Sequence, residues 1–307
     1  MKIFLTVGSR FPMDRLVSLV DEYIGDHSDI SCIAQIGDSQ YLMKNGEAYH
    51  RLEQQQFTEY AKNSDVIISH AGIGNIALAA KLSKPVIVMA RQGALQEHIN
   101  DHQISTLKGL QHKEFIYAIE DRDSLKSALQ WASQWILSED KQSVAANVEL
   151  VNYIKHYMRQ RDHGKVLAVS SAGGHWTQLQ MLQPILDNYD VTFMTTSINS
   201  DLRSNRCIVT VCDADISRKF KLLLLGVQSF FYMLKIRPDI VISTGAAPGF
   251  FAVMFAKLFK KKTIWLDSIA NYEQLSISGK YVKPFSDVFL VQWPHLAHEG
   301  LYKGALI

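Results

Sequence analysis

The sequence contains few cysteines, little excess charge and no long apolar run. Its 307 residues include Cys32, Cys207 and Cys212, an odd number without metal-site spacing. We therefore expect reduced thiols in a cytosolic protein, and no metal or other cofactor. The net charge of +2 argues against a nucleic-acid partner. No run reaches the roughly 18 to 20 apolar residues that span a bilayer, and the first segment becomes polar too early for a signal peptide. These absences predict a soluble or membrane-peripheral protein.

Strand-like and helix-like segments alternate along the whole chain. This alternation is typical of parallel, doubly wound sheets, so we expect the α/β class. A polar, helix-prone stretch at 140–161 predicts a linker between domains 1–160 and 161–307. The expected strands cover 2–7, 30–36, 66–68, 86–89, 115–119, 165–169, 191–195, 207–212, 239–243, 263–266 and 287–291, where the last closes the sheet, and the expected helices include 14–24, 54–62, 124–135 and 177–186.

A glycine turn, SHAGIGN at 69–75, joins an apolar strand to a helix that Asn75 could cap. Gly72 and Gly74 would let a phosphate approach the helix N-terminus, where N–H groups and the helix dipole favour anions. The alternative is that these glycines serve only packing. Gly8 and Ser9 follow the first strand and are secondary candidates, with a plain turn as the alternative.

A polar segment, EHINDHQ at 97–103, follows Arg91 and the strand at 86–89. Open sheets bind ligands at the carboxyl ends of their strands, and carboxylates, imidazoles and amides suit a hydroxyl-rich ligand. The alternatives are a capped helix start or a metal site, although no further cluster of ligands accompanies the two histidines and two acids.

A second glycine turn, SSAGGHW at 170–176, places His175 at the start of a helix. The helix dipole disfavours protonation of an imidazole there, and a packed turn with an incidental histidine is the alternative. The loop TGAAPG at 244–249 follows another strand, and Asp267 ends the next one.

An apolar segment, LLLLGVQSFFYML, has cationic residues at both ends and is too short to span a bilayer. It is either a buried helix of the second domain or an amphipathic helix on a membrane surface, and both can hold. The membrane-facing candidates are Arg218, Lys219, Lys221 and Lys235.

The first half resembles the donor-binding domain of inverting GT-B glycosyltransferases, through SHAGIGN, KPVIV, Arg91 and EHxNDHQ. The resemblance is to the catalytic subunits of bacterial capsule and exopolysaccharide transferases, and to the eukaryotic enzyme that adds the second GlcNAc to a dolichol-linked sugar. It implies that the glycine turn holds UDP pyrophosphate and that the polar segment holds ribose and sugar. Leu78 departs from the related peptidoglycan enzyme, which has a ribose-binding glutamate there, so Glu97 would take that role. The residues carried over are His70, Gly72, Gly74, Asn75, Glu97, His98, Asp101, His102 and Gln103.

The second half resembles the membrane-associated acceptor subunit of the same systems, through SSAGGHW, KIRPDIVISTGAAPG, TIWLDS and SDVFLVQW. The chain therefore looks like a fusion of both subunits, with two Rossmann-like domains facing a cleft. His175 is expected as catalytic base or as diphosphate anchor, and Asp267 as the competing base. The acceptor-binding candidates are Ser171, Gly173, Gly174, Thr244 and Gly245.

These patterns and resemblances predict an inverting transferase that moves a sugar from a UDP-sugar to a polyprenyl-diphosphate-linked saccharide, in exopolysaccharide or capsule synthesis at the cytoplasmic face of the inner membrane. Glucuronic acid, galactose and GlcNAc are the candidate sugars. Arg91 could pair with a uronate carboxylate, which favours glucuronate, or it could bind phosphate. The alternatives are a non-catalytic scaffold that activates a partner transferase, and a UDP-sugar epimerase.

Overall fold

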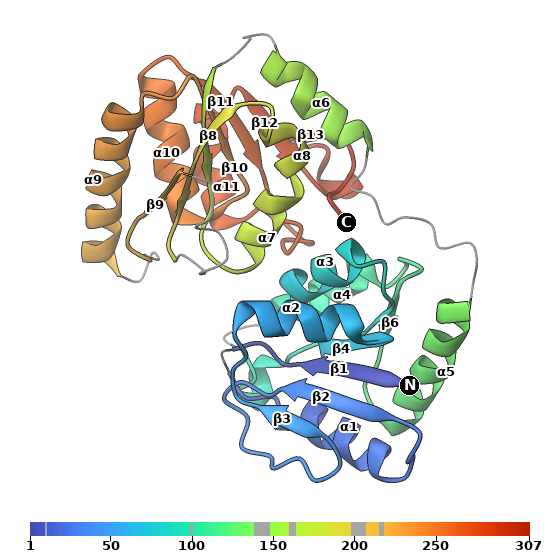
Figure 1. The fold of residues 1–307 in the computed structure, drawn as a ribbon. Helices are drawn as coiled ribbons and strands as arrows, with labels where there is room; N and C mark the ends of the chain where they lie inside the picture. Colours follow the sequence, from blue (N-terminus) through green and yellow to red (C-terminus); the bar gives the residue numbers. More distant parts are fainter. Residues whose placement is uncertain (10, 99–100, 138–147, 160–163, 198–206, 215–217) are drawn as a thin grey trace. The chain divides into compact units, whose positions relative to one another are not determined.

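The computed structural model describes residues 1–9, 11–98, 101–137, 148–159, 164–197, 207–214 and 218–307. The chain forms two compact units, Met1–Val144 and Ala145–Ile307. Each unit contains one β-sheet with helices packed on it (Figure 1). All strand pairs in the described residues are parallel. The expected α/β class with two parallel-sheet domains is therefore confirmed.

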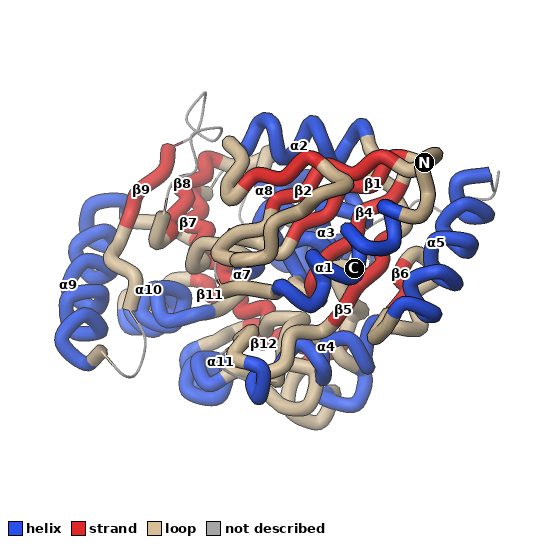
Figure 2. The backbone as a smooth tube through the Cα atoms, turned by 90° about the horizontal axis from the view of Figure 1, so that it is seen from below, coloured by secondary structure: helices blue, strands red, loops and turns tan. Residues whose placement is uncertain are grey.

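The first unit has the strand order β3-β2-β1-β4-β5-β6, and Figure 2 shows its inner strands running side by side. The side chains of β1 point alternately to the two faces of the sheet. Ile3 and Leu5 pack against α1 and α5 on one face, whereas Phe4 contacts Phe57 of α2 on the other. The strands are β1 Lys2–Thr6, β2 Ser31–Gln35, β3 Glu47–Tyr49, β4 Val66–His70, β5 Val86–Met89 and β6 Ile116–Ala118, and the helices are α1 Asp14–Gly25, α2 Gln54–Asn63, α3 Ile73–Lys81, η1 Gly93–Leu95, α4 His102–Leu110 and α5 Arg122–Leu137.

The second unit has the order β13-β12-β11-β10-β7-β8-β9. One face of its sheet packs on α6, α7 and α8, and the other on α9 and α10. The strands are β7 Lys165–Val169, β8 Asp190–Thr195, β9 Cys207–Thr210, β10 Ile240–Ser243, β11 Lys262–Leu266, β12 Val288–Val291 and β13 Leu301–Tyr302, and the helices are α6 Val148–Arg159, α7 Gly174–Met181, α8 Gln183–Leu186, α9 Lys219–Ile236, α10 Ala246–Leu258, α11 Ile277–Val282, η3 Lys283–Phe285 and η4 Pro294–Leu296.

Three expectations about the elements are wrong. The helix expected at 177–186 is two helices, because Pro184 in the first turn of α8 lacks the N–H that a continuous helix would use. β12 does not close its sheet, since the two-residue strand β13 pairs beyond it. The division between the units falls before residue 160, because α6 buries Leu150, Ile154 and Met158 in the core of the second unit.

Candidate functional site

The carboxyl ends of β1 and β4 meet at the imidazole of His70. These strands are direct neighbours, with Thr6 opposite Ser69. Gly8 has a φ of +79°, and a Cβ there would lie 3.2 Å from Cε1 of His70, while a Cβ at Gly72 would lie 2.4 Å from Nε2. Glycine is therefore needed in both turns, and it allows both to close on one ring. Ser9, which follows Gly8, is exposed.

Helix α3 begins two residues earlier than its expected cap. Gly72 is the N-cap, Gly74 lies in the first turn, and Asn75 is already helical. The Asn75 amide instead donates to Ser69 Oγ at 2.6 Å and lies 3.3 Å from Nδ1 of His70. Asn75 thus links α3 to the end of β4. The first N–H groups of α3 have no intrahelical acceptor, which makes this helix start a suitable place for an anion.

His70 is neutral at physiological pH. Burial lowers its pKa to about 3, the positive charge of Arg91 contributes in the same direction, and a hydrogen bond with the Thr6 backbone opposes both. Because the Asn75 amide faces Nδ1 as a donor, Nδ1 accepts and Nε2 carries the proton. The ring therefore carries its proton at Nε2 and has no positive charge.

Arg91 does not have the free guanidinium that a uronate or phosphate partner would require. Its side chain is fully buried. Nη1 donates to the Glu97 carbonyl at 2.6 Å, and Nη2 donates to the carbonyls of Val7 and Phe11. The side chain thus ties the end of β5 to the loop after β1, and the expected donor-binding role of Arg91 stays a prediction that these contacts do not favour.

Glu97 is also engaged within the fold. It is 5% exposed, and its carboxylate accepts from Nε and Nη2 of Arg15 at 3.1 and 2.9 Å and from the Gln92 N–H at 3.0 Å. This paired, buried carboxylate fixes the loop after β5 on α1. The geometry therefore gives Glu97 a structural role in place of the open ribose contact that we expected. The sequence offered no signal for Arg15, whose partner lies 82 residues away.

The remaining polar residues of the segment surround the start of α4. Asp101 is exposed and accepts from the Gly93 N–H at 2.7 Å, and His102 is the exposed first residue of the helix. Gln103 accepts from the Arg91 N–H at 3.2 Å, and the His98 ring lies 5.4 Å from that of Phe11. Ile99 and Asn100 lie outside the described residues. Asp101 and His102 are accordingly the members most open to a ligand.

In the second unit, His175 and Thr244 join the ends of two neighbouring strands, β7 and β10. Nδ1 of His175 lies 2.9 Å from the Thr244 carbonyl, and Thr244 Oγ1 donates to the His175 carbonyl at 2.8 Å. A Cβ at Gly245, whose φ is +129°, would lie 2.6 Å from Nδ1. The structure therefore brings His175, Thr244 and Gly245 together as expected.

The turn before His175 leaves open space beside Gly173. Gly173 has a φ of +83°, and a Cβ built there would meet nothing within 4 Å. Gly174 is the first residue of α7 and Ser171 is partly exposed in the turn. These three candidates lie together at the start of the helix.

The pKa of His175 is lowered, as expected, but burial is the main cause, with the Thr244 hydrogen bond and the charge of Asp267 acting against it. A carbonyl can only accept a hydrogen bond, so Nδ1 carries the proton and Nε2 has the lone pair. At neutral pH the ring is therefore a neutral base at Nε2.

Asp267 is not arranged as a base. It is 2% exposed, and its carboxylate accepts from the indole of Trp265 at 3.0 Å and from the N–H and hydroxyl of Ser276 at 2.9 and 2.5 Å. Asp267 thereby holds the start of α11 against the end of β11. Its carboxylate oxygens are thus engaged within the fold, and the expectation that it competes with His175 as the base stays a prediction.

A buried amide network, which the sequence did not predict, supports the helix that carries His175. The Gln178 amide donates to Ser268 Oγ at 3.0 Å, and its oxygen accepts from the Ile269 N–H at 3.1 Å and from Gln292 at 2.9 Å. These contacts join α7 to the ends of β11 and β12. Gln178 therefore fixes the start of α7 within the unit.

Helix α9 exposes one apolar face and buries the other. Leu225, Gly226, Ser229 and Met233 are buried, whereas Phe220 is 88% exposed and Leu223 67% exposed. Both predicted readings of this helix are thus compatible with its structure. No described helix is long and apolar enough to cross a membrane. The four cationic candidates Arg218, Lys219, Lys221 and Lys235 are all exposed.

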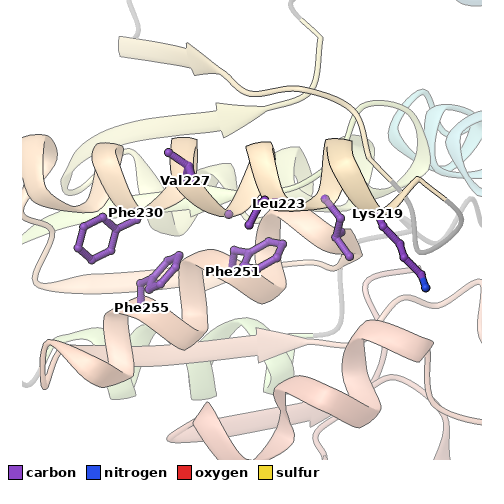
Figure 3. A pocket seen from close by; sticks show the side chains of 8 residues that line it. Lys219, Leu223, Val227, Phe230, Phe251 and Phe255 are labelled. Atoms are coloured by element: carbon purple, nitrogen blue, oxygen red, sulfur yellow. The ribbon is translucent and has the colours of Figure 1, made fainter.

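A groove of about 460 Å³ lies at the seam where α9 and α10 pack together (Figure 3). Its lining is apolar except at one end, where Lys219 lies. Among the described residues, no three histidines, cysteines or acids lie together as metal ligands.

Residues 148–305 match the family described as "Oligosaccharide biosynthesis protein Alg14 like". Because this match covers just over half of the chain, the protein belongs to that family. Residues 2–148 match the glycosyltransferase family 28 C-terminal domain. The chain therefore joins a glycosyltransferase 28-type half to an Alg14-like half, in agreement with the expected GT-B type of fold.

The similar proteins include several named UDP-N-acetylglucosamine transferase subunit ALG14. The mouse protein is 28% identical over 193 residues, which cover 50% of this chain and 87% of the relative. The Yarrowia lipolytica protein is 34% identical over 82 residues (24% and 38%), and the human protein is 34% identical over 90 residues (26% and 41%). The chain thus spans most of the mouse relative and less than half of the other two.

Solved structures are similar only at a low level. The UDP-GlcNAc 2-epimerase of Neisseria meningitidis gives a TM-score of 0.21 at 13% identity, covering 92% of this chain and 85% of the other. A branched-chain amino acid ABC transporter of Thermus thermophilus gives 0.32 at 11%, covering 95% and 64%. Neither similarity carries a conclusion about activity.

Proposed function

We propose that this protein transfers N-acetylglucosamine, with inversion, from UDP-N-acetylglucosamine to a saccharide linked through a diphosphate to a polyisoprenoid lipid. The observation that carries the proposal is that one chain joins a glycosyltransferase 28-type unit to an Alg14-like unit. The relatives' name supports N-acetylglucosamine as the sugar. Glucuronate has lost its support, because the Arg91 guanidinium already binds carbonyls.

The donor would bind at the carboxyl ends of β1, β4 and β5. The start of α3, with Gly72 and Gly74, would take the pyrophosphate, and its dipole would stabilise the charge on departing UDP. His70, as a neutral ring, could donate from Nε2 to a donor oxygen. Asp101 and His102, which are exposed at the start of α4, suit sugar or ribose hydroxyls.

The acceptor hydroxyl would be activated by His175. The oxygen of the acceptor hydroxyl would bond to the anomeric carbon of the donor sugar, and the bond from that carbon to the UDP oxygen would break. The hydroxyl proton would pass to Nε2 of His175. The lone pair at Nε2 and the lowered pKa both suit this role. Neither suits a diphosphate anchor, which would need a proton or a positive charge at Nε2. We therefore favour the base over the anchor.

The exposed apolar face of α9 and its cationic ends would place the protein on the cytoplasmic face of an anionic membrane. Neutralising the four cationic candidates should weaken binding to anionic vesicles by about 1 kcal/mol per residue near the surface. Vesicles of neutral lipid provide the comparison, because they retain only the apolar contribution.

The test combines donor binding with turnover. UDP-GlcNAc should raise the melting temperature of the protein more than UDP-galactose or UDP-glucuronate, because a ligand stabilises the state it binds. GlcNAc transfer should then require the lipid-linked acceptor. The relatives' name "subunit" favours one second candidate, a scaffold that activates a partner transferase. Donor binding without transfer by this chain alone would support the scaffold, and donor conversion without any acceptor would support an epimerase.

A further inference from the structure

The groove between α9 and α10 begins near the two loops of the second unit that carry the acceptor-binding candidates, residues 170–174 and 244–245. We call these the acceptor loops. The two helices run in the same direction, since Gly226 faces Phe251 and Phe230 faces Phe255. Helix α10 starts directly after Gly245, so Phe251 lies only about 8 Å along the helix from the loop that contacts His175. The groove therefore extends from the edge of the sheet where His175 lies.

The lining of the groove has one charged end and an apolar floor. On α9 it is formed by a stripe at helical spacing that includes Lys219, Leu223, Gly226 and Phe230. Gly226 lets the Phe251 ring pack closely against α9 and form the floor, because a Cβ there would lie 3.2 Å from that ring. From Lys219 to Phe230 the stripe is about 16 Å long. Figure 3 shows Lys219 at one end and the rings of Phe230 and Phe255 at the other.

We propose that this groove holds the first part of the polyisoprenoid chain of the acceptor, with the Lys219 ammonium close to the acceptor's diphosphate. The inference rests on the proposed function and adds a binding site for the lipid chain. Three features support this occupant. The cation at only one end matches a molecule with one anionic head, and the apolar floor matches a chain. The charged end also lies at the same end of the parallel helix pair as Gly245. A concave groove also suits a single chain better than a flat bilayer surface.

The test uses two water-soluble probes, the methyl ester and a ten-carbon isoprenoid ester of GlcNAc diphosphate, with binding measured by calorimetry without lipid or detergent. The wild-type protein should bind the isoprenoid ester about 100-fold more tightly, because the additional carbons leave water in the groove. Leu223→Gln, which changes the lining, should reduce this preference to about tenfold. Leu224→Gln is the matched control, since Leu224 is also exposed but does not line the groove.

Stabilisation by UDP-GlcNAc shows that each variant is folded. Lys219→Ala should weaken both esters by the same factor, because it contacts the shared head group. Equal affinity of the wild-type protein for the two esters would overturn the groove while leaving the proposed function in place. If Leu223→Gln and Leu224→Gln reduced the preference equally, the isoprenoid chain would bind the whole exposed face of α9. That result would also overturn the groove as its binding site. If neither ester bound, the lipid-linked acceptor itself would be refuted.

Discussion

Protonation of His70 should destabilise the turns that close on it. The pKa of this ring is lowered to about 3 in the folded protein, against about 6.5 in an unfolded chain. Between these values the unfolded state binds more protons, so stability falls as the pH decreases below 6.5. At pH 5.0 the free energy of unfolding is lower than at neutral pH by at most about 2 kcal/mol. This value takes 1.36 kcal/mol for each of the roughly 1.5 pH units below the unfolded pKa. This is an upper value, because His70 is not completely buried.

His70→Gln removes the titrating group and keeps an amide that can hydrogen-bond. Amide hydrogen exchange of peptides from β4 and α3, followed by mass spectrometry at pH 7.0 and 5.0, measures the local opening free energy. Between the two pH values, the wild-type protein should lose up to about 30-fold more protection than the variant. His112→Gln, at an exposed histidine, is the control and should behave as wild type.

The comparison between proteins at one pH cancels the intrinsic pH dependence of exchange. If wild type and His70→Gln lost protection equally between pH 7.0 and 5.0, His70 would not be held neutral by its surroundings. The assignment of a neutral N–H to the donor site would then have to be withdrawn.

Three further predictions concern the two sites. Gly74→Val should abolish UDP binding in calorimetry while the protein stays folded, because a branched side chain would cover the start of α3; unchanged affinity would exclude this turn as the phosphate site. Glu97→Gln should lower the melting temperature and cost about 1 to 3 kcal/mol, since it leaves Arg15 with a weaker partner; a variant as stable as wild type would contradict the structural role of this pair. His175→Asn should reduce kcat by about 10² to 10⁴ without changing UDP-sugar affinity, and the wild-type pH profile should show its basic group titrating below the usual histidine range; a rise in KM alone would instead support the diphosphate anchor.

The sequence predicted the central strands β1, β4, β5, β7 and β10 well, because each is a largely apolar run that is buried on both faces. It missed β3, Glu47–Tyr49, whose residues are partly or fully exposed, and β13, which has only two residues. Both lie at sheet edges. Apolar patterns cannot reveal such strands, because edge pairing depends on backbone hydrogen bonds with little apolar burial.

Glycine turns were predicted more reliably than the roles of charged residues. Gly8, Gly173 and Gly245 have positive φ, which follows from local chain geometry. Arg91 was expected to bind a ligand and Asp267 to act as a base, yet the first binds carbonyls more than 75 residues away and the second binds Trp265 and Ser276. A charged residue at the end of a strand gives the same sequence pattern whether it serves a site or binds other residues of the fold. Only its tertiary partners distinguish the two roles.

Both units contain a neutral histidine beside a glycine turn, but the two rings carry their proton on different nitrogens. In each, a histidine lies against a glycine at the carboxyl end of a neighbouring strand, and burial keeps the ring neutral. At His70 the Asn75 amide donates towards Nδ1, which leaves an N–H at Nε2. At His175 the Thr244 carbonyl accepts from Nδ1, which leaves a lone pair at Nε2. In the proposed transfer, the N–H of His70 would donate to the UDP-sugar, whereas the lone pair of His175 would take the proton of the acceptor hydroxyl. The partner of Nδ1 therefore determines which part of the transfer each histidine can serve.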